Sequence, residues 1–167
     1  MKELQLRPAT ASEWNEYRAV IIPDYAAGRV RAGEWDPDEA DALSAKAVNE
    51  LLPEGVETRG MLLRAAETPD GDVVGLVWLA LNRPASQDSA WIYYIEIFPR
   101  WRGKGYGRAL LRAAEQESMR HGATNIGLNV FGENTVARSL YDSSAYAITS
   151  MTMRKELSER SGEQVDW

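Results

Sequence analysis

The sequence predicts an α/β (α+β) domain with a mixed central sheet, and three observations support this. The apolar residues change from helical spacing to strand-like runs near residue 61. From there strands come first and then alternate with helices, an order typical of a mixed sheet in one domain. The chain has 167 residues, 44% of them hydrophobic, which suits one domain with its own core.

A short strand and a helix are expected at the N-terminus. Leu4 and Leu6, before Pro8, favour the strand. The run Thr10-Ala-Ser-Glu13 has the form of a capping box, so a helix is expected to begin there. The residues that follow at three- and four-residue spacing are Trp14, Tyr17, Arg18 and Ile21. This spacing puts the apolar groups on one face of the helix.

A second helix is expected from residue 36 to about residue 52. Asp36 can cap it, Pro37 suits its first turn, and the carboxylates that follow favour its positive end. Pro53 and Gly55 end it.

The middle of the chain predicts three strands. Residues 61–66 and 73–81 are joined by the turn Pro69-Asp-Gly-Asp72. After a loop at 82–89, residues 91–98 form a third strand rich in aromatic and β-branched residues.

The last third predicts a glycine-rich turn at 103–107 and a helix to about residue 121. A strand at 125–130, a short helix at 134–143 and a final strand at 147–153 follow. The domain is expected to span residues 1–157, with residues 158–167 as a polar tail.

Composition excludes several classes of function. With no cysteine and one histidine, disulfides, thiolate zinc sites and cysteine nucleophiles are excluded, and no metal site is expected. The formal charge of -6 argues against a nucleic-acid partner. No apolar run approaches the roughly 20 residues of a membrane span, and the start lacks a secretory signal. A cytoplasmic protein with no membrane partner is expected.

The segment Arg102-Gly-Lys-Gly-Tyr-Gly107 lies between a predicted strand and a predicted helix. Backbone N–H groups at a helix start can bind an anion, and glycines let a phosphate approach closely. The spacing fits neither a P-loop nor a dinucleotide fingerprint. The alternative is a glycine-rich turn with solvated basic residues.

The segment from Ala90 to Leu111 resembles the acyl-CoA-binding core of the GNAT N-acetyltransferases. Their Arg/Gln-x-x-Gly-x-Gly/Ala signature is matched by Arg102, Gly105 and Gly107. The run Asn134-Thr-Val-Ala-Arg-Ser-Leu-Tyr141 is similar to a second family motif. The resemblance extends to about residue 157. It implies a mainly antiparallel sheet flanked by helices, with splayed fourth and fifth strands.

The resemblance also implies that acetyl-CoA is the cofactor. Its diphosphate would bind the amides of residues 102–107, and its pantetheine arm would bond the backbones of Glu96, Ile97 and Phe98. The full set of implied cofactor-binding residues is Glu96, Ile97, Phe98, Arg102, Gly103, Lys104, Gly105, Tyr106, Gly107, Arg108, Asn134, Ala137, Arg138 and Tyr141.

The implied reaction is direct attack of a primary amine on acetyl-CoA in a ternary complex. Tyr141 would protonate the departing thiolate, although it could instead belong to the core. Asn134 is also a good helix cap. Some family members carry a base where this chain has Asn129, so Glu96 is the next candidate, directly or through water. Glu96 could equally be a carboxylate paired with a nearby Arg, and His121 is a poor candidate because it ends a helix.

The family also has Gly where this chain has Ala145, so the exit from the last helix is expected to differ here.

The acceptor is expected to be a small-molecule or peptide amine. Its candidate contacts are Tyr25, Trp35, Tyr94 and Asn129, beside an acidic and aromatic segment around residues 34–41 that would suit a cation. The alternative for that segment is a solvated helix start.

The sequence leaves two other functions open. One is a non-catalytic acyl-CoA-binding sensor of the same fold. The other is a phosphate-binding enzyme such as a kinase, which the absent Lys-Ser/Thr pair disfavours. The protein is expected to be a monomer or a homodimer.

Overall fold

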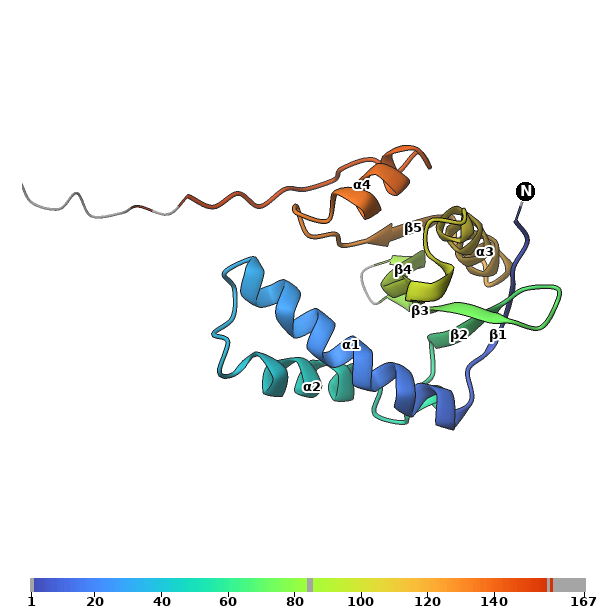
Figure 1. The fold of residues 1–167 in the computed structure, drawn as a ribbon, viewed down its shortest axis with the longest axis horizontal. Helices are drawn as coiled ribbons and strands as arrows, with labels where there is room; N and C mark the ends of the chain where they lie inside the picture. The colour runs from blue at the N-terminus through green and yellow to red at the C-terminus, as the bar shows by residue number, and fades with distance from the viewer. Residues whose placement is uncertain (1, 84–85, 156, 158–167) are drawn as a thin grey trace, which may run out of the picture.

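The computed structural model describes residues 2–83, 86–155 and 157. Their strands form one sheet in the order β1-β2-β3-β4-β5. The strands are β1 Gln5–Pro8, β2 Met61–Glu67, β3 Val73–Arg83, β4 Ser86–Ile97 and β5 Asn125–Leu128. The helices are α1 Ala11–Arg31, α2 Ala40–Leu51, α3 Tyr106–Arg120 and α4 Thr135–Asp142, with short 3-10 turns at Gly55–Glu57 and Pro99–Trp101. Figure 1 shows α1 and α2 together on one side of the sheet.

The predicted mixed sheet is confirmed. Neighbouring strands from β1 to β4 are antiparallel, whereas β4 and β5 are parallel. The pairing of β4 with β5 covers only residues 89–92 and 125–128. On its other side β4 stays paired with β3 as far as Ile97. Among the described residues, the second half of β4 therefore has no strand beside it on the β5 side, which is the predicted splay.

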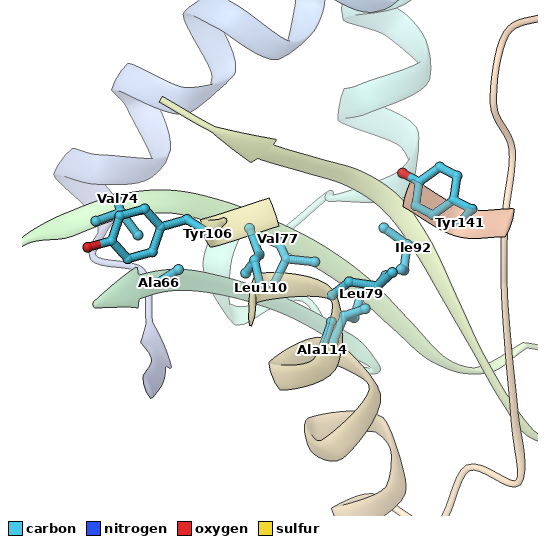
Figure 2. Close-up of a cluster of buried hydrophobic side chains, with 10 residues drawn as sticks. Ala66, Val74, Val77, Leu79, Ile92, Tyr106, Leu110, Ala114 and Tyr141 are labelled. Carbon is cyan, nitrogen blue, oxygen red and sulfur yellow. The ribbon is translucent and has the colours of Figure 1, made fainter. Parts of the chain in front are cut away.

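Two hydrophobic clusters cover the two faces of the sheet. One is built from sheet residues with α3 and α4, and Figure 2 shows most of it. Its buried members are Ala66, Val74, Val77, Leu79, Ile92, Tyr106, Leu110, Leu111, Ala114 and Tyr141. The other joins α1 and α2 to the sheet through residues that include Trp14, Tyr17, Ile21, Val48, Leu76 and Trp78. The buried face predicted for the first helix is thus confirmed.

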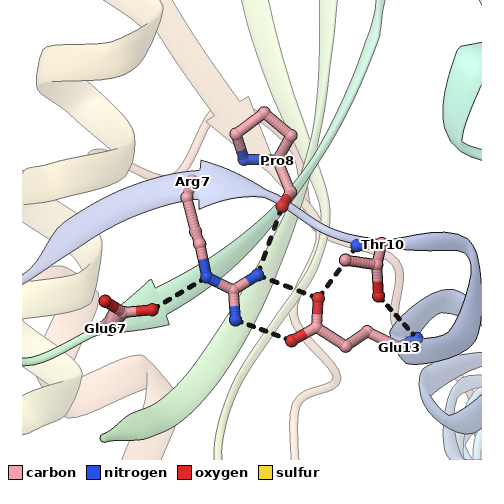
Figure 3. A network of polar contacts seen from close by, with 5 residues as sticks. All are labelled: Arg7, Pro8, Thr10, Glu13 and Glu67. Atoms are coloured by element: carbon pink, nitrogen blue, oxygen red, sulfur yellow. Dashed lines mark hydrogen bonds and ion pairs between the residues drawn. The ribbon is translucent and has the colours of Figure 1, made fainter. Parts of the chain in front are cut away.

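The predicted capping box at the start of α1 is present. The Glu13 amide donates to Thr10 Oγ1 at 3.2 Å, and the Thr10 amide donates to Glu13 Oε2 at 2.8 Å. Arg7 of β1 joins this cap to β2, because its guanidinium donates to Glu13 and also to Glu67 (Figure 3). These bonds with Arg7 hold the pKa of Glu13 well below its usual range, at about 2, against the opposing effect of burial.

Several predicted boundaries were wrong. The loop predicted at 82–89 is largely strand, since β3 reaches Arg83 and pairs with Ser86 at the start of β4. Antiparallel backbone bonds continue past the apolar residues, because they do not depend on side-chain polarity. The second helix begins at Ala40, since Asp36 accepts from the Asp38 amide at 2.9 Å and stabilises a turn ahead of the helix.

The strand predicted at 147–153 is also wrong. These residues are exposed and have no regular secondary structure. A strand needs a partner, and the sheet formed by the described residues ends at β5. The predicted tail, residues 158–167, lies outside the described residues. Among those described, no helix is both long and apolar enough to cross a membrane.

Candidate functional site

The glycine-rich turn leads directly into α3. Gly105 is the N-cap of that helix with φ 83°, and Gly103 has φ 71°. A Cβ atom added at either glycine would meet no heavy atom within 4 Å. No side chain among the described residues caps the helix start, so its first amides are available to an anion. The backbone here fits a diphosphate.

The basic side chains of this turn have different partners. Arg102 donates to Glu96 Oε1 at 2.7 Å and to the Ile97 carbonyl at 2.9 Å. Arg108 donates to the carbonyl and hydroxyl of Ser143, at 3.2 and 2.7 Å. Lys104 lies over the Trp101 ring, 5.0 Å from its centroid, and has no ion pair with a described residue. Lys104 is therefore the exposed cation of the turn that is not engaged by a carboxylate or a carbonyl.

The side chain of Tyr106 belongs to the core. It is buried, and its ring meets Trp101 edge-on with centroids 5.6 Å apart. Only its backbone can contribute to an anion site.

Arg108 connects the start of α3 with the end of α4, the helix that carries Tyr141. Tyr141 is 8% exposed, and burial raises the pKa of its hydroxyl. Its ring packs beside Tyr146, with centroids 5.6 Å apart. Tyr141 is thus a core residue, and its proposed role as a proton donor would place that donor in a buried position.

The other predicted residues of this helix serve local structure. Asn134 Oδ1 accepts from the Ala137 amide at 3.1 Å, which is the helix-cap arrangement. Arg138 donates to the Gly132 carbonyl at 2.9 Å, and Ala137 packs against the core. Asn134 caps the helix and is nevertheless exposed.

The backbone groups of β4 are not equally available to a ligand. The Phe98 amide donates to the Val74 carbonyl at 2.9 Å, and the Phe98 carbonyl accepts from the Trp101 amide at 2.8 Å. Backbone groups alternate in direction along an antiparallel pair, so Ile97 is the residue whose groups face away from β3. Of the three predicted pantetheine contacts, Ile97 has the geometry for that role, and its carbonyl is bonded to Arg102.

A polar cluster surrounds the Tyr94 hydroxyl at the end of β4. This hydroxyl lies 3.1 Å from Asp24 Oδ2 and 3.2 Å from Glu96 Oε2. Burial, followed by the charges of Glu96 and Asp24, raises the pKa of Tyr94 above its usual range. The ion pair with Arg102 is the alternative role that the sequence analysis gave for Glu96. Glu96 also shares the Tyr94 hydroxyl with a second carboxylate, that of Asp24.

Asp24 was missed by the sequence reasoning. It lies 70 residues from Tyr94, so no local motif connects the two. A signal did exist, because Asp24 follows Tyr17 by seven residues and Ile21 by three. These spacings place it beside Tyr17 and Ile21 on α1, at the exposed margin of the face that packs on the sheet.

The other predicted acceptor residues lie apart from this cluster. Tyr25 and Trp35 stack edge-on with centroids 5.4 Å apart. Arg29 lies over both rings, 4.9 and 5.6 Å from their centroids, and pairs with Glu34. A cationic ligand at these rings would have to displace Arg29.

Asn129 and His121 are both exposed. Asn129 lies one residue beyond β5, and its described contacts do not connect it to Glu96 or Tyr141. His121 caps the end of α3, where its Nε2 lies 3.7 Å from Glu117 Oε1. The structure therefore leaves His121 at a helix end, as the sequence indicates.

Comparison with known proteins gives a consistent result. Residues 14–146 match the acetyltransferase (GNAT) family. The chain is 32% identical over 154 residues to the uncharacterized N-acetyltransferase YycN of Bacillus subtilis, covering 92% of this chain and 99% of YycN. The crystal structure of YycN, described as a putative acetyltransferase, superposes with a TM-score of 0.88 at 33% identity, over 93% of this chain and 99% of that one. A mycothiol acetyltransferase of Renibacterium salmoninarum is 27% identical over 84% of this chain and 43% of that protein.

Proposed function

The chain belongs to the acetyltransferase (GNAT) family, and from this premise we propose that it transfers the acetyl group of acetyl-CoA to a primary amine. When bound, acetyl-CoA supplies an activated thioester whose acetyl group passes to the amine nitrogen while the sulfur leaves as a thiol. The observation that carries the proposal is the open glycine turn at the start of α3, tied by Arg108 to the helix that holds Tyr141.

The proposed cofactor site is built on backbone rather than on side chains. The amides of residues 103–107 at the start of α3 bind the diphosphate, because they are uncapped and open to approach. The Arg102 amide is not among them, since it donates to the Pro99 carbonyl at 3.2 Å. Lys104 adds a positive charge beside them. The backbone of Ile97, which faces away from β3, bonds the pantetheine arm in the gap left by the splayed β4 and β5.

Tyr141 is the proposed general acid. Burial raises the pKa of its hydroxyl, so the hydroxyl keeps its proton at neutral pH. A protonated phenol can give that proton to a thiolate as the charge develops.

The polar cluster of Asp24, Tyr94 and Glu96 is the proposed acceptor site. Two carboxylates within hydrogen-bond distance of one tyrosine hydroxyl attract a protonated primary amine. Glu96 then takes a proton from that amine, so that the nitrogen lone pair is free to attack. Asp24 holds the ammonium form in place and does not exchange the proton.

The test is turnover of acetyl-CoA, measured as free thiol, against a panel of primary amines with matched neutral alcohols. We expect release with at least one cationic amine. The Asp24→Asn variant should raise KM for that amine by about ten- to a hundredfold, the size of a lost charge-assisted hydrogen bond. Its kcat should stay near the wild-type value. Acetyl-CoA binding without turnover on any amine would favour the non-catalytic alternative, and an unchanged KM in Asp24→Asn would remove Asp24 from the acceptor site.

A further inference from the structure

Gly28 lies inside α1, where glycine is a poor choice for the stability of a helix. It is nevertheless buried, because the ring of Phe131, from the segment that follows β5, covers it. A Cβ atom added at Gly28 would overlap Phe131 Cε2 and would lie 2.8 Å from Phe131 Cζ, well inside the van der Waals distance of about 3.5–4.0 Å. Any side chain larger than a hydrogen at this position would therefore move the ring.

The segment that carries Phe131 is tied to both α4 and α1. The Gly132 carbonyl accepts from Arg138 of α4 at 2.9 Å. On the other side Glu133 forms an ion pair with Arg31 at the end of α1. Figure 1 shows this segment, between β5 and α4, reaching toward that end of α1. The ring is thus held in place from two sides.

The ring lies close to the proposed acceptor site. Asp24 and Gly28 are four residues apart, so they share one face of α1 and lie about 6 Å from each other along the helix axis. Asp24 contacts the Tyr94 hydroxyl at 3.1 Å, and Gly28 contacts the Phe131 ring. An amine held by Asp24 therefore has this ring as its neighbour on the side toward the C-terminal end of α1.

We propose that Phe131, seated on Gly28, is a specificity-determining residue that restricts the acceptor to primary amines on an unbranched carbon. This role rests on the proposed function, since it requires an amine bound by Asp24, Tyr94 and Glu96. A nitrogen that donates to the Asp24 carboxylate lies about 2.8 Å from its oxygen. With about 6 Å between the two positions on α1, a branch on the carbon next to that nitrogen meets the ring. An unbranched chain leaves toward solvent instead, because Asp24 is exposed.

The first test compares pairs of amines that differ only by a methyl group on the carbon that bears the nitrogen. The pairs are the most active amine of the panel and its α-methyl derivative, propylamine and sec-butylamine, and benzylamine and α-methylbenzylamine. One carbon group in a binding pocket changes kcat/KM by about 10–200-fold, so the wild type should prefer the unbranched member by at least about tenfold. The Phe131→Ala variant should lose most of this preference through a lower KM for the branched amines, with an unchanged Kd for acetyl-CoA.

The matched control for Phe131→Ala is Val130→Ala, which shortens the neighbouring side chain that packs against the core. This control should keep the preference for unbranched amines. If the wild type uses both members of every pair equally, or if Phe131→Ala keeps the preference, Phe131 does not set the specificity, and the proposed function stands because unbranched amines still react. If no amine releases thiol, the proposed function fails and the role of Phe131 fails with it.

The second test examines the contact between Gly28 and Phe131 and does not depend on activity. Gly28→Ala should lower the Tm of the wild type, since the new methyl group collides with the ring. In the Phe131→Ala background the same change should raise Tm, because alanine favours a helix more than glycine does. The control is Gly107→Ala in α3, where the added Cβ would lie 3.5 Å from Leu140 Cδ2, an ordinary contact, and its shift in Tm should be equal in both backgrounds. A Gly28→Ala shift of the same sign in both backgrounds would show that the ring is not seated on α1 and would overturn the proposal.

Discussion

Tyr141 is the side chain whose replacement tests the proposed chemistry most directly. The Tyr141→Phe variant keeps the buried ring but removes the proton donor. General acid catalysis contributes about 10²–10⁴ in rate, so kcat should fall by that factor while acetyl-CoA affinity changes little. The measurement is single-turnover thiol release, which isolates chemistry from product release. The control is Tyr146→Phe, the neighbouring tyrosine 5.6 Å away between ring centroids. Equal losses in both variants would assign the effect to packing.

Glu96 has a role that pH can distinguish. A primary amine has a pKa near 10, so at neutral pH it is almost entirely protonated. If Glu96 accepts the proton of the amine, turnover by the Glu96→Gln variant should follow the fraction of the amine that is already neutral. This fraction rises about tenfold per pH unit below the pKa of the amine. The gap in turnover between wild type and variant should therefore narrow as pH rises. The controls are Asn129→Ala and His121→Ala, which should show no pH-dependent loss. A gap that stays constant from neutral pH to pH ~10 would mean that the protein only selects amine that is already neutral.

Single residues also show where sequence reasoning succeeds and where it fails. The place of Gly105 at the start of α3 was predictable because it depends on backbone conformation within one turn. The expectation that Ala145 would change the exit from the last helix was wrong, because Ala145 takes a left-handed conformation with φ 65° in spite of a strain of roughly 1 kcal/mol. Asp24 was not predictable as a partner of Tyr94, because their contact depends on how α1 crosses the sheet.

The elements of the fold are joined at the start of α1 by the network shown in Figure 3. Arg7 on β1 bonds Glu13 on α1 at 2.7 Å and Glu67 on β2 at 2.8 Å. The folded-state pKa of Glu13 is depressed to about 2. Its contribution to the free energy of unfolding is therefore complete above the unfolded pKa of about 4.3 and is lost as pH falls through the folded value.

We therefore expect Glu13→Gln to lower the free energy of unfolding at pH 7 by about 1–2 kcal/mol, a value reduced by the partial exposure of Arg7. The difference from wild type should shrink between pH 4.5 and pH 2 in urea titrations. Glu16→Gln is the matched control, since it removes the same charge from an exposed position on α1. A deficit for Glu13→Gln that does not change with pH would mean that the ion pairs with Arg7 are not its source.

For the helices and strands, the sequence predicts the type of each element better than its first and last residues. The capping box located the start of α1 because its two hydrogen bonds are local. The β3–β4 hairpin was missed because pairing between strands continues through polar residues. The strand predicted at 147–153 failed for a different reason. Its β-branched and apolar residues are typical of a strand, but a strand also needs a neighbouring strand to bond, and none of the described strands lies beside these residues.

The whole molecule brings together three segments that are far apart in the sequence. The cluster at Tyr94 depends on α1 crossing the face of the sheet, whereas the glycine turn and α4 depend on α3. Both motifs of the candidate cofactor site could be recognised in the sequence because each lies within one short segment. The candidate acceptor site could not be recognised in this way, because its geometry depends on how α1 crosses the sheet and on how far the side chains extend. The proposed acceptor chemistry therefore depends on tertiary structure, and the proposed cofactor chemistry depends on local backbone.

A ligand that binds only the folded state stabilises the whole molecule, and this gives a test of the glycine turn that does not need the acceptor. Acetyl-CoA at a hundred times its Kd should raise the free energy of unfolding by about 2.7 kcal/mol. The Gly105→Asp variant places a negative side chain where the diphosphate would approach, so it should lose most of that gain. Gly122→Asp is a matched control at the other end of α3, since Gly122 also has positive φ, 86°, and open space around its Cβ. Both variants carry similar backbone strain, so a loss of unliganded stability alone is not informative. The informative quantity is the shift in Tm on adding acetyl-CoA, together with the Kd from calorimetry. A Gly105→Asp protein that keeps the wild-type shift would show that the anion site lies elsewhere.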